Sequence, residues 1–182
     1  MRIAWTHAGA KRSLAVRLLA FFLSAGSAAA QPASAGDSFL EHLAGKWVLR
    51  GTIAGKATTH DIASTWVLDH RYLQIHERSR ETRGDGKAQY EAIVLVSRDP
   101  ATGEYQCLWL DTTTGGGLAP EAFARAKRSG DTLPFLFREA DGTLSFNNTF
   151  SYDRKEDSWT WRMDNVREGK ASPFGFVRLT RR

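Results

Sequence analysis

The sequence predicts an all-β protein, an antiparallel barrel or sandwich of about eight to ten short strands that follows one short helix. After residue 45, apolar and polar residues alternate along most of the chain, which is the period of a half-buried strand. Turn residues separate these segments at short, regular intervals. No linker rich in proline or serine divides residues 38–182, so we expect a single domain there.

Residues 1–30 have the features of a secretory signal peptide. A basic start is followed by an apolar segment at 14–23, and small residues at 27–30 place the cleavage before Gln31. An uncleaved membrane anchor is the alternative, but a spanning helix needs about 20 predominantly apolar residues, and this segment is shorter. We therefore expect an exported protein, periplasmic or secreted, with no stable membrane span after cleavage.

The mature chain is expected to begin with a short flexible segment, residues 31–37, ahead of the folded domain. The whole chain carries a formal net charge of +5, from 25 basic and 20 acidic residues. Four of the basic residues and none of the acidic ones lie in the leader, which leaves 21 basic against 20 acidic side chains. A nearly neutral body gives no electrostatic reason to bind nucleic acid.

Cys107 is the only cysteine, so an exported chain of this kind has no internal disulfide to stabilise it. It lies in the apolar run 105–110, and we expect it to be buried. A reactive thiol is the alternative.

The first predicted element is a helix of about two turns. Ser38 and Glu41 have the spacing of a capping box, in which the two side chains satisfy the free amides at a helix start. Phe39, Leu40 and Leu43 would form its apolar face, and Gly45 would end it.

The strands are predicted from alternation and from the turns between them. A bend at Asp69-His70 separates the second from the third, and Pro134 is expected to mark a sheet edge or a bulge. Residues 121–127 have helical propensity as well, but we assign strand there. The expected strands are 47–53, 62–68, 72–76, 90–97, 105–111, 123–128, 132–137, 144–152, 159–164 and 174–180.

Several segments resemble one known family. Gly45-Lys46-Trp47 is similar to the G-x-W entry of lipocalin-like, calycin-type barrels. The segments at 66–73, 97–105 and 109–111, and the W-x-W-x-M-D pattern at 159–164, resemble a bacterial exported lipocalin-like family of unknown function. The resemblance covers residues 38–182 and implies an antiparallel barrel with a small internal cavity and no established reaction.

The same resemblance implies a plug at one end of the barrel. In such barrels the tryptophan of the G-x-W entry closes the floor, and a basic residue near the last strand packs over it. We assign these roles to Trp47 and Arg178, with Arg181 as the alternative.

The alternating aromatic residues predict a cavity as well as a core. Asp111 has the parity of Trp109, and Asn148 that of Phe146, so polar groups accompany aromatic ones to the same face. Apolar walls with a few polar groups are typical of small-molecule sites. We therefore predict that the lumen binds a small, largely apolar ligand through Trp66, Arg71, His76, Trp109, Asp111, Asn148 and Trp161.

Two other interpretations stay open: a packed structural or interaction barrel, and an isomerase, cyclase or hydrolase with Asp111 or His76 as its acid–base group. The sequence has no G-x-S-x-G, H-E-x-x-H or P-loop motif. His70 and His76 would lie about 20 Å apart on one strand, too far to share a metal ion.

We expect no cofactor and no metal. Nitrobindin-like barrels, which share this architecture, hold haem through a histidine late in the chain. The mature histidines, His42, His60, His70 and His76, all lie in the first half.

Overall fold

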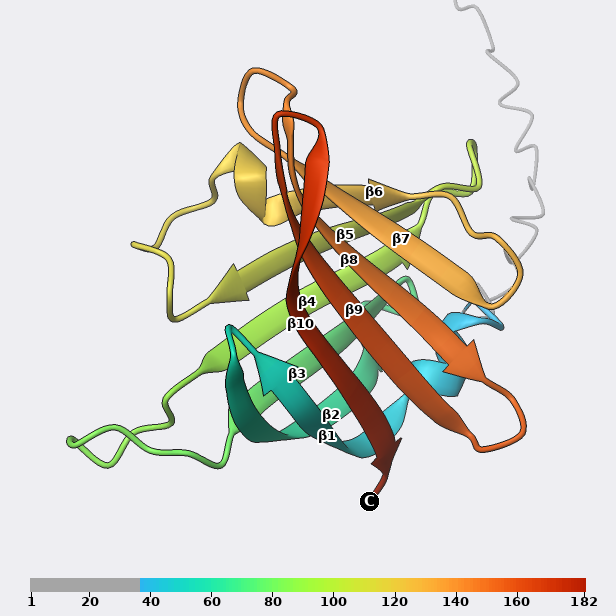
Figure 1. Ribbon diagram of the computed structural model, residues 1–182. Helices are drawn as coiled ribbons and strands as arrows, with labels where there is room; N and C mark the ends of the chain where they lie inside the picture. Colours follow the sequence, from blue (N-terminus) through green and yellow to red (C-terminus); the bar gives the residue numbers. More distant parts are fainter. Residues whose placement is uncertain (1–36) are drawn as a thin grey trace, which may run out of the picture. The chain divides into compact units, whose positions relative to one another are not determined.

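The computed structural model describes residues 37–182, so the predicted leader and the segment before Asp37 lie outside the described residues. These residues form one closed antiparallel barrel of ten strands, in which each strand pairs with the next and β1 pairs with β10 (Figure 1). The strands are β1 Gly45–Ile53, β2 Lys56–Val67, β3 Tyr72–Ser79, β4 Glu91–Arg98, β5 Tyr105–Asp111, β6 Phe123–Ala126, β7 Thr132–Arg138, β8 Leu144–Asp153, β9 Ser158–Arg167 and β10 Lys170–Arg181.

The all-β prediction and all ten expected strands are confirmed. Strand alternation produces the core: on β7, for example, Leu133, Phe135 and Phe137 are buried, while the residues between them are not. Cys107 on β5 is buried as expected, and burial raises the pKa of its thiol, which keeps it protonated.

The predicted two-turn helix is wrong. The chain instead forms a single 3-10 turn, η1, at Leu40–Leu43. Asp37, and not Ser38, caps it, because its carboxylate accepts the N–H groups of Phe39 and Leu40, each at 3.0 Å. β1 begins at Gly45, so the chain has no room for a second turn.

Trp47 lies at the η1 end of the barrel with its side chain completely buried. Its indole N–H donates to the carbonyl of Leu43 at 2.8 Å. The guanidinium over its ring belongs to Arg181, whose Cζ lies 3.8 Å from the ring centroid. The assignment of Arg178 is therefore corrected. Arg181 is the cross-strand partner of Trp47 and shares its face, whereas Arg178 is three residues away, pairs with Arg50 and points outward.

Two irregular points of the sheet follow the sequence. Pro134 pairs with Thr149 of β8, but β6 is too short to reach it, so the missing amide of the proline faces an unpaired stretch. The bend between β2 and β3 has positive φ angles at Leu68, Asp69 and His70.

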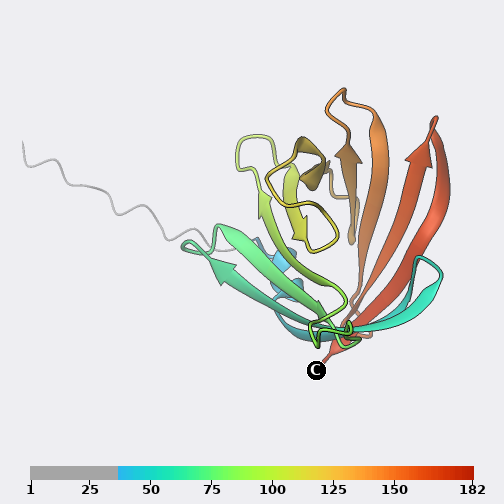
Figure 2. The same cartoon turned by 90° about the vertical axis from the view of Figure 1, so that its left-hand side faces the viewer.

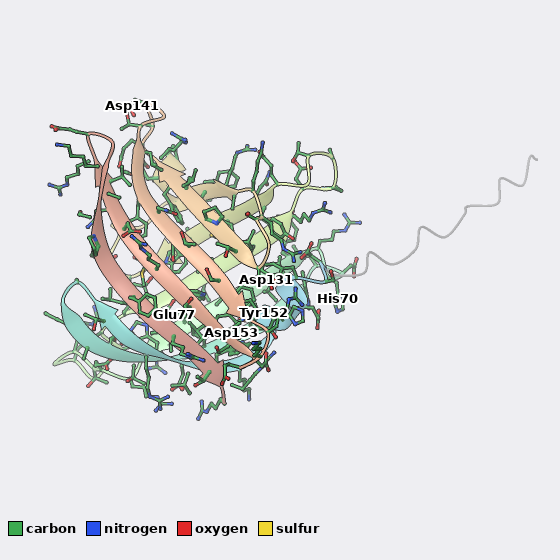
Figure 3. The ribbon with its side chains drawn as sticks, turned by 45° about the vertical axis from the view of Figure 1, so that its right-hand side comes forward. His70, Glu77, Asp131, Asp141, Tyr152 and Asp153 are labelled. Carbon is green, nitrogen blue, oxygen red and sulfur yellow. The ribbon has the colours of Figure 1, made fainter. Side chains whose placement is uncertain are left out.

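The two ends of the barrel differ. In Figure 1, η1 lies on the opposite side of the barrel from the loop that carries the second 3-10 turn, η2 (Pro120–Ala122). Figure 3 places His70, Asp131 and Tyr152 toward the η1 end and Asp141 at the other. At the η1 end the space is filled by aromatic packing, with the rings of Phe39 and Trp159 only 5.3 Å apart.

Candidate functional site

A cavity of about 590 Å³ lies inside the barrel. Its rim is formed by the β1–β2 turn and by the loop from Thr113 to Ala122, which includes η2. Figure 2 shows the barrel from the side of this loop, with the strands curving around it. A volume of a few hundred Å³ is the usual size of a small-molecule site. We call this space the lumen cavity.

The wall of the lumen cavity is mostly aromatic and aliphatic. Trp109 and Trp161 meet edge to face, with ring centroids 6.0 Å apart, and Phe150 stacks behind Trp161 at 4.3 Å. This packing fixes the orientation of the indoles before any ligand arrives. Other apolar residues of the wall are Leu49, Ile53, Phe137, Phe146, Met163 and Phe174.

A buried histidine and a buried glutamate face the cavity from neighbouring strands. Nδ1 of His60 on β2 bonds to Oε1 of Glu77 on β3, and the two residues are only 3% and 2% exposed. The other ring nitrogen, Nε2, lies 2.7 Å from the hydroxyl oxygen of Thr58. Thr58 in turn donates to Oε2 of Glu81 at 3.2 Å. The cluster therefore runs as a hydrogen-bonded chain from Glu81 to Glu77.

Glu81 is ionised and lies at the outer end of this chain. Its partial burial opposes ionisation, but hydrogen bonds from its own backbone N–H, from the N–H of Thr59 and from the hydroxyl of Thr58 outweigh that effect and lower its pKa. Glu81 therefore contributes a negative charge to the cavity at neutral pH.

Tyr90 connects the aromatic wall to the acidic groups. The indole N–H of Trp109 donates to the Tyr90 hydroxyl at 2.9 Å, and that hydroxyl donates to Oδ2 of Asp111 at 3.3 Å. The phenol ring also stacks on His60, with centroids 5.5 Å apart. Burial, and then the negative charges of Glu77 and Asp111, raise the pKa of Tyr90, so the phenol keeps its proton.

Asp111 also holds the loop that forms the rim of the lumen cavity. Its Oδ1 accepts the backbone N–H groups of Thr113 at 2.8 Å and of Thr114 at 3.2 Å. One carboxylate thus ends β5, starts the rim loop and anchors Tyr90.

Three buried polar atoms of the cavity wall are unsatisfied. Among residues 37–182, Oε2 of Glu77, Oδ1 of Asn148 and Nε1 of Trp161 have no hydrogen-bond partner. The hydroxyl of Ser64 is also without one in this part of the chain, but Ser64 does not line the cavity. An unmade hydrogen bond at a buried group costs on the order of 1–3 kcal/mol, so a ligand group that reached one of these atoms would recover part of that cost.

Four of the seven predicted ligand-binding residues, Trp109, Asp111, Asn148 and Trp161, line the lumen cavity together. The other three do not. The indole of Trp66 donates to Glu41 at 2.6 Å beside η1, and Arg71 is exposed in the β2–β3 turn. His76 faces outward and bonds to Glu91 at 2.7 Å, because Ile75 and Glu77 on either side of it occupy the inner face.

The sequence prediction missed His60, Glu77 and Tyr90. Alternation offered a clue for the first two, since His60 has the parity of buried Ile62, and Glu77 that of buried Ile75. Tyr90 precedes β4 and is half-buried beside its first residue, where alternation gives no guide.

The described part of the chain has neither a cluster of metal-ligating side chains nor a long apolar helix. Between residues 37 and 182, no three His, Cys, Asp or Glu side chains are grouped so that they could hold a metal ion. No helix within this range is long and apolar enough to cross a bilayer.

The fold and the cavity define a closed, ten-stranded antiparallel β-barrel with a hollow, mixed polar and apolar lumen, an architecture compatible with a calycin-like barrel. Neither a scan against protein-family models nor a search of curated proteins finds a match to this chain.

Proposed function

We propose that this protein is an exported, lipocalin-like carrier or receptor that binds one small, largely apolar molecule in the lumen cavity. The observation that carries the proposal is a cavity of about 590 Å³ whose aromatic wall contains three buried polar atoms without partners among residues 37–182. In a barrel with a purely structural role, an empty lumen with unpaired polar atoms would be unfavourable. A lumen filled with apolar side chains would make such a barrel more stable.

The two kinds of wall have different tasks in this proposal. Apolar surface contributes affinity at about 25 cal/mol per Å² removed from water. The polar groups contribute orientation, since each can be satisfied only by a ligand atom in one place. Trp109 serves both, because its ring is part of the wall and its N–H holds the Tyr90 hydroxyl.

Intrinsic tryptophan fluorescence tests the proposal directly. Titration with the neutral apolar probe N-phenylnaphthylamine should quench part of the emission saturably, with a single site. Trp161→Phe should reduce the quenched amplitude, since this indole lies in the cavity wall. Trp66→Phe is the matched control, because Trp66 lies beside η1 and outside the cavity. An emission that decreases only linearly, without saturation, would contradict a binding site.

Export is the second part of the proposal, and the sequence of residues 1–30 supports it. The mass of the intact protein recovered after expression in its natural cells should correspond to a chain that begins at Gln31. Full-length protein in the membrane fraction would contradict export and favour the uncleaved anchor.

A further inference from the structure

We propose that the lumen cavity selects a ligand whose polar end is an amine, held by Glu77 and Asn148, and that it discriminates against carboxylates such as fatty acids. The inference rests on the binding function proposed above and specifies the chemical class of the ligand.

The unsatisfied acceptors are the first support. Oε2 of Glu77 and Oδ1 of Asn148 both belong to residues that are 2% exposed, and neither oxygen has a hydrogen-bond partner within residues 37–182. An ammonium group brings up to three N–H donors and a positive charge to such oxygens. A carboxylate brings further acceptors and a like charge, so it would leave both oxygens unsatisfied.

The charge of the lining is the second support. Four acidic side chains line the cavity, namely Glu77, Glu81, Asp111 and Glu121, and they face one lysine, Lys56, and one histidine, His60. No arginine of the described residues is among the lining side chains. The guanidinium group that would hold a carboxylate in a bidentate manner is therefore missing from this wall.

The two basic groups of the lining do not reverse this preference. Both ring nitrogens of His60 are already engaged, Nδ1 with Glu77 and Nε2 with the hydroxyl of Thr58, so His60 offers no free donor to an acidic ligand. Lys56 is the first residue of β2 and is exposed at the rim. Its ammonium group is solvated there, so water screens its field inside the cavity.

The Tyr90 phenol lies in the field of two of these carboxylates. After burial itself, the charges of Glu77 and Asp111 are what raise the pKa of its phenol. The same two carboxylates would stabilise a cation that enters from the rim and would repel an anion.

Three probes with one tail and different heads test the inference. Decylamine, decanol and decanoate, each kept below its critical micelle concentration, should displace N-phenylnaphthylamine from the wild-type protein with the amine strongest and the acid weakest. We expect decylamine to bind at least about tenfold more tightly than decanoate, a ratio typical of one charge-assisted hydrogen bond.

Two variants assign the effect to residues. Glu77→Gln and Asn148→Leu should each bring the amine-to-acid affinity ratio closer to one, the first by removing the charge and the second by removing the neutral acceptor. Asn148→Leu covers the case in which Glu77→Gln does not fold, since Oδ1 of Asn148 makes no hydrogen bond to the described residues that would be lost. Glu156→Gln is the matched control, because it makes the same charge change at an exposed position of the β8–β9 turn.

The outcomes separate the inference from the function on which it rests. Equal or tighter binding of decanoate overturns the amine preference but leaves the binding function standing. Failure of N-phenylnaphthylamine and of all three tailed probes to bind overturns both. An amine preference that survives in both cavity variants overturns the assignment to Glu77 and Asn148.

Discussion

Asp111 shows how one residue can serve both the scaffold and the site. Its two carboxylate oxygens have different partners. Oδ1 accepts the backbone N–H of Thr113 in the rim loop, and Oδ2 accepts the hydroxyl of Tyr90 inside the cavity. Asp111→Asn keeps an oxygen for the loop amides and removes the charge. We expect the variant to remain folded and to bind an amine probe about 1–3 kcal/mol more weakly, as measured by probe displacement. Unchanged affinity for every probe would show that Asp111 belongs to the scaffold alone.

Trp47 carries the packing of the opposite end. Its ring lies under the guanidinium of Arg181 and its N–H is bonded to Leu43, so truncation removes a buried aromatic and a hydrogen bond together. Trp47→Ala should lower the free energy of unfolding by about 3–5 kcal/mol, measured by urea denaturation. A loss below about 1 kcal/mol would mean that the tryptophan does not close the barrel.

At the scale of elements, substitutions before η1 test whether Asp37 or Ser38 caps this turn. Asp37 caps η1 and also accepts the Tyr105 hydroxyl at 3.0 Å, which ties the entry segment to β5. Asp37→Ala should cost about 1 kcal/mol of stability or more, the usual loss for a removed N-cap. Ser38→Ala is the neighbouring control and should be nearly neutral, as Ser38 is exposed. The opposite order of effects in thermal melts would restore the capping box that the sequence suggested.

The strands were predictable because apolar and polar residues alternate along a strand that is buried on one face only. On β4, Ala92, Val94 and Val96 face inward, and the turn from Pro100 to Gly103 marks where the chain reverses. The helix was not predictable to the same degree. Two acceptors, Asp37 and Ser38, stand side by side before it, and the sequence pattern does not say which of them accepts the free amides.

The candidate site was predictable only in part for a related reason. Trp109, Asp111, Asn148 and Trp161 were placed correctly by parity with neighbouring aromatics. By parity with Ile75, Glu77 faces inward and His76 faces outward. The prediction named His76 instead, and a glutamate usually faces solvent, whereas a histidine is more often found inside. The buried contact between His60 and Glu77 joins residues 17 positions apart. It runs diagonally across β2 and β3, since His60 pairs with Ser79 and Glu77 pairs with Ile62.

At the scale of the whole molecule, stability and binding are divided along the barrel. Within residues 37–182 every strand pairs with a neighbour on both sides, although the short β6 leaves part of β7 unpaired. The η1 end is packed solid around Trp47, while the end beside η2 is hollow. This division explains why substitutions of the cavity wall should change affinity with little effect on folding, whereas substitutions around η1 should do the reverse.

The claim that the lumen holds a small molecule is tested most directly by native mass spectrometry of the protein purified under mild conditions from its natural cells. The native protein should have a mass that exceeds that of the polypeptide by one small molecule, which is released on denaturation and carries a basic nitrogen. A folded protein with the mass of the polypeptide alone, still unchanged after incubation with decylamine, would contradict it.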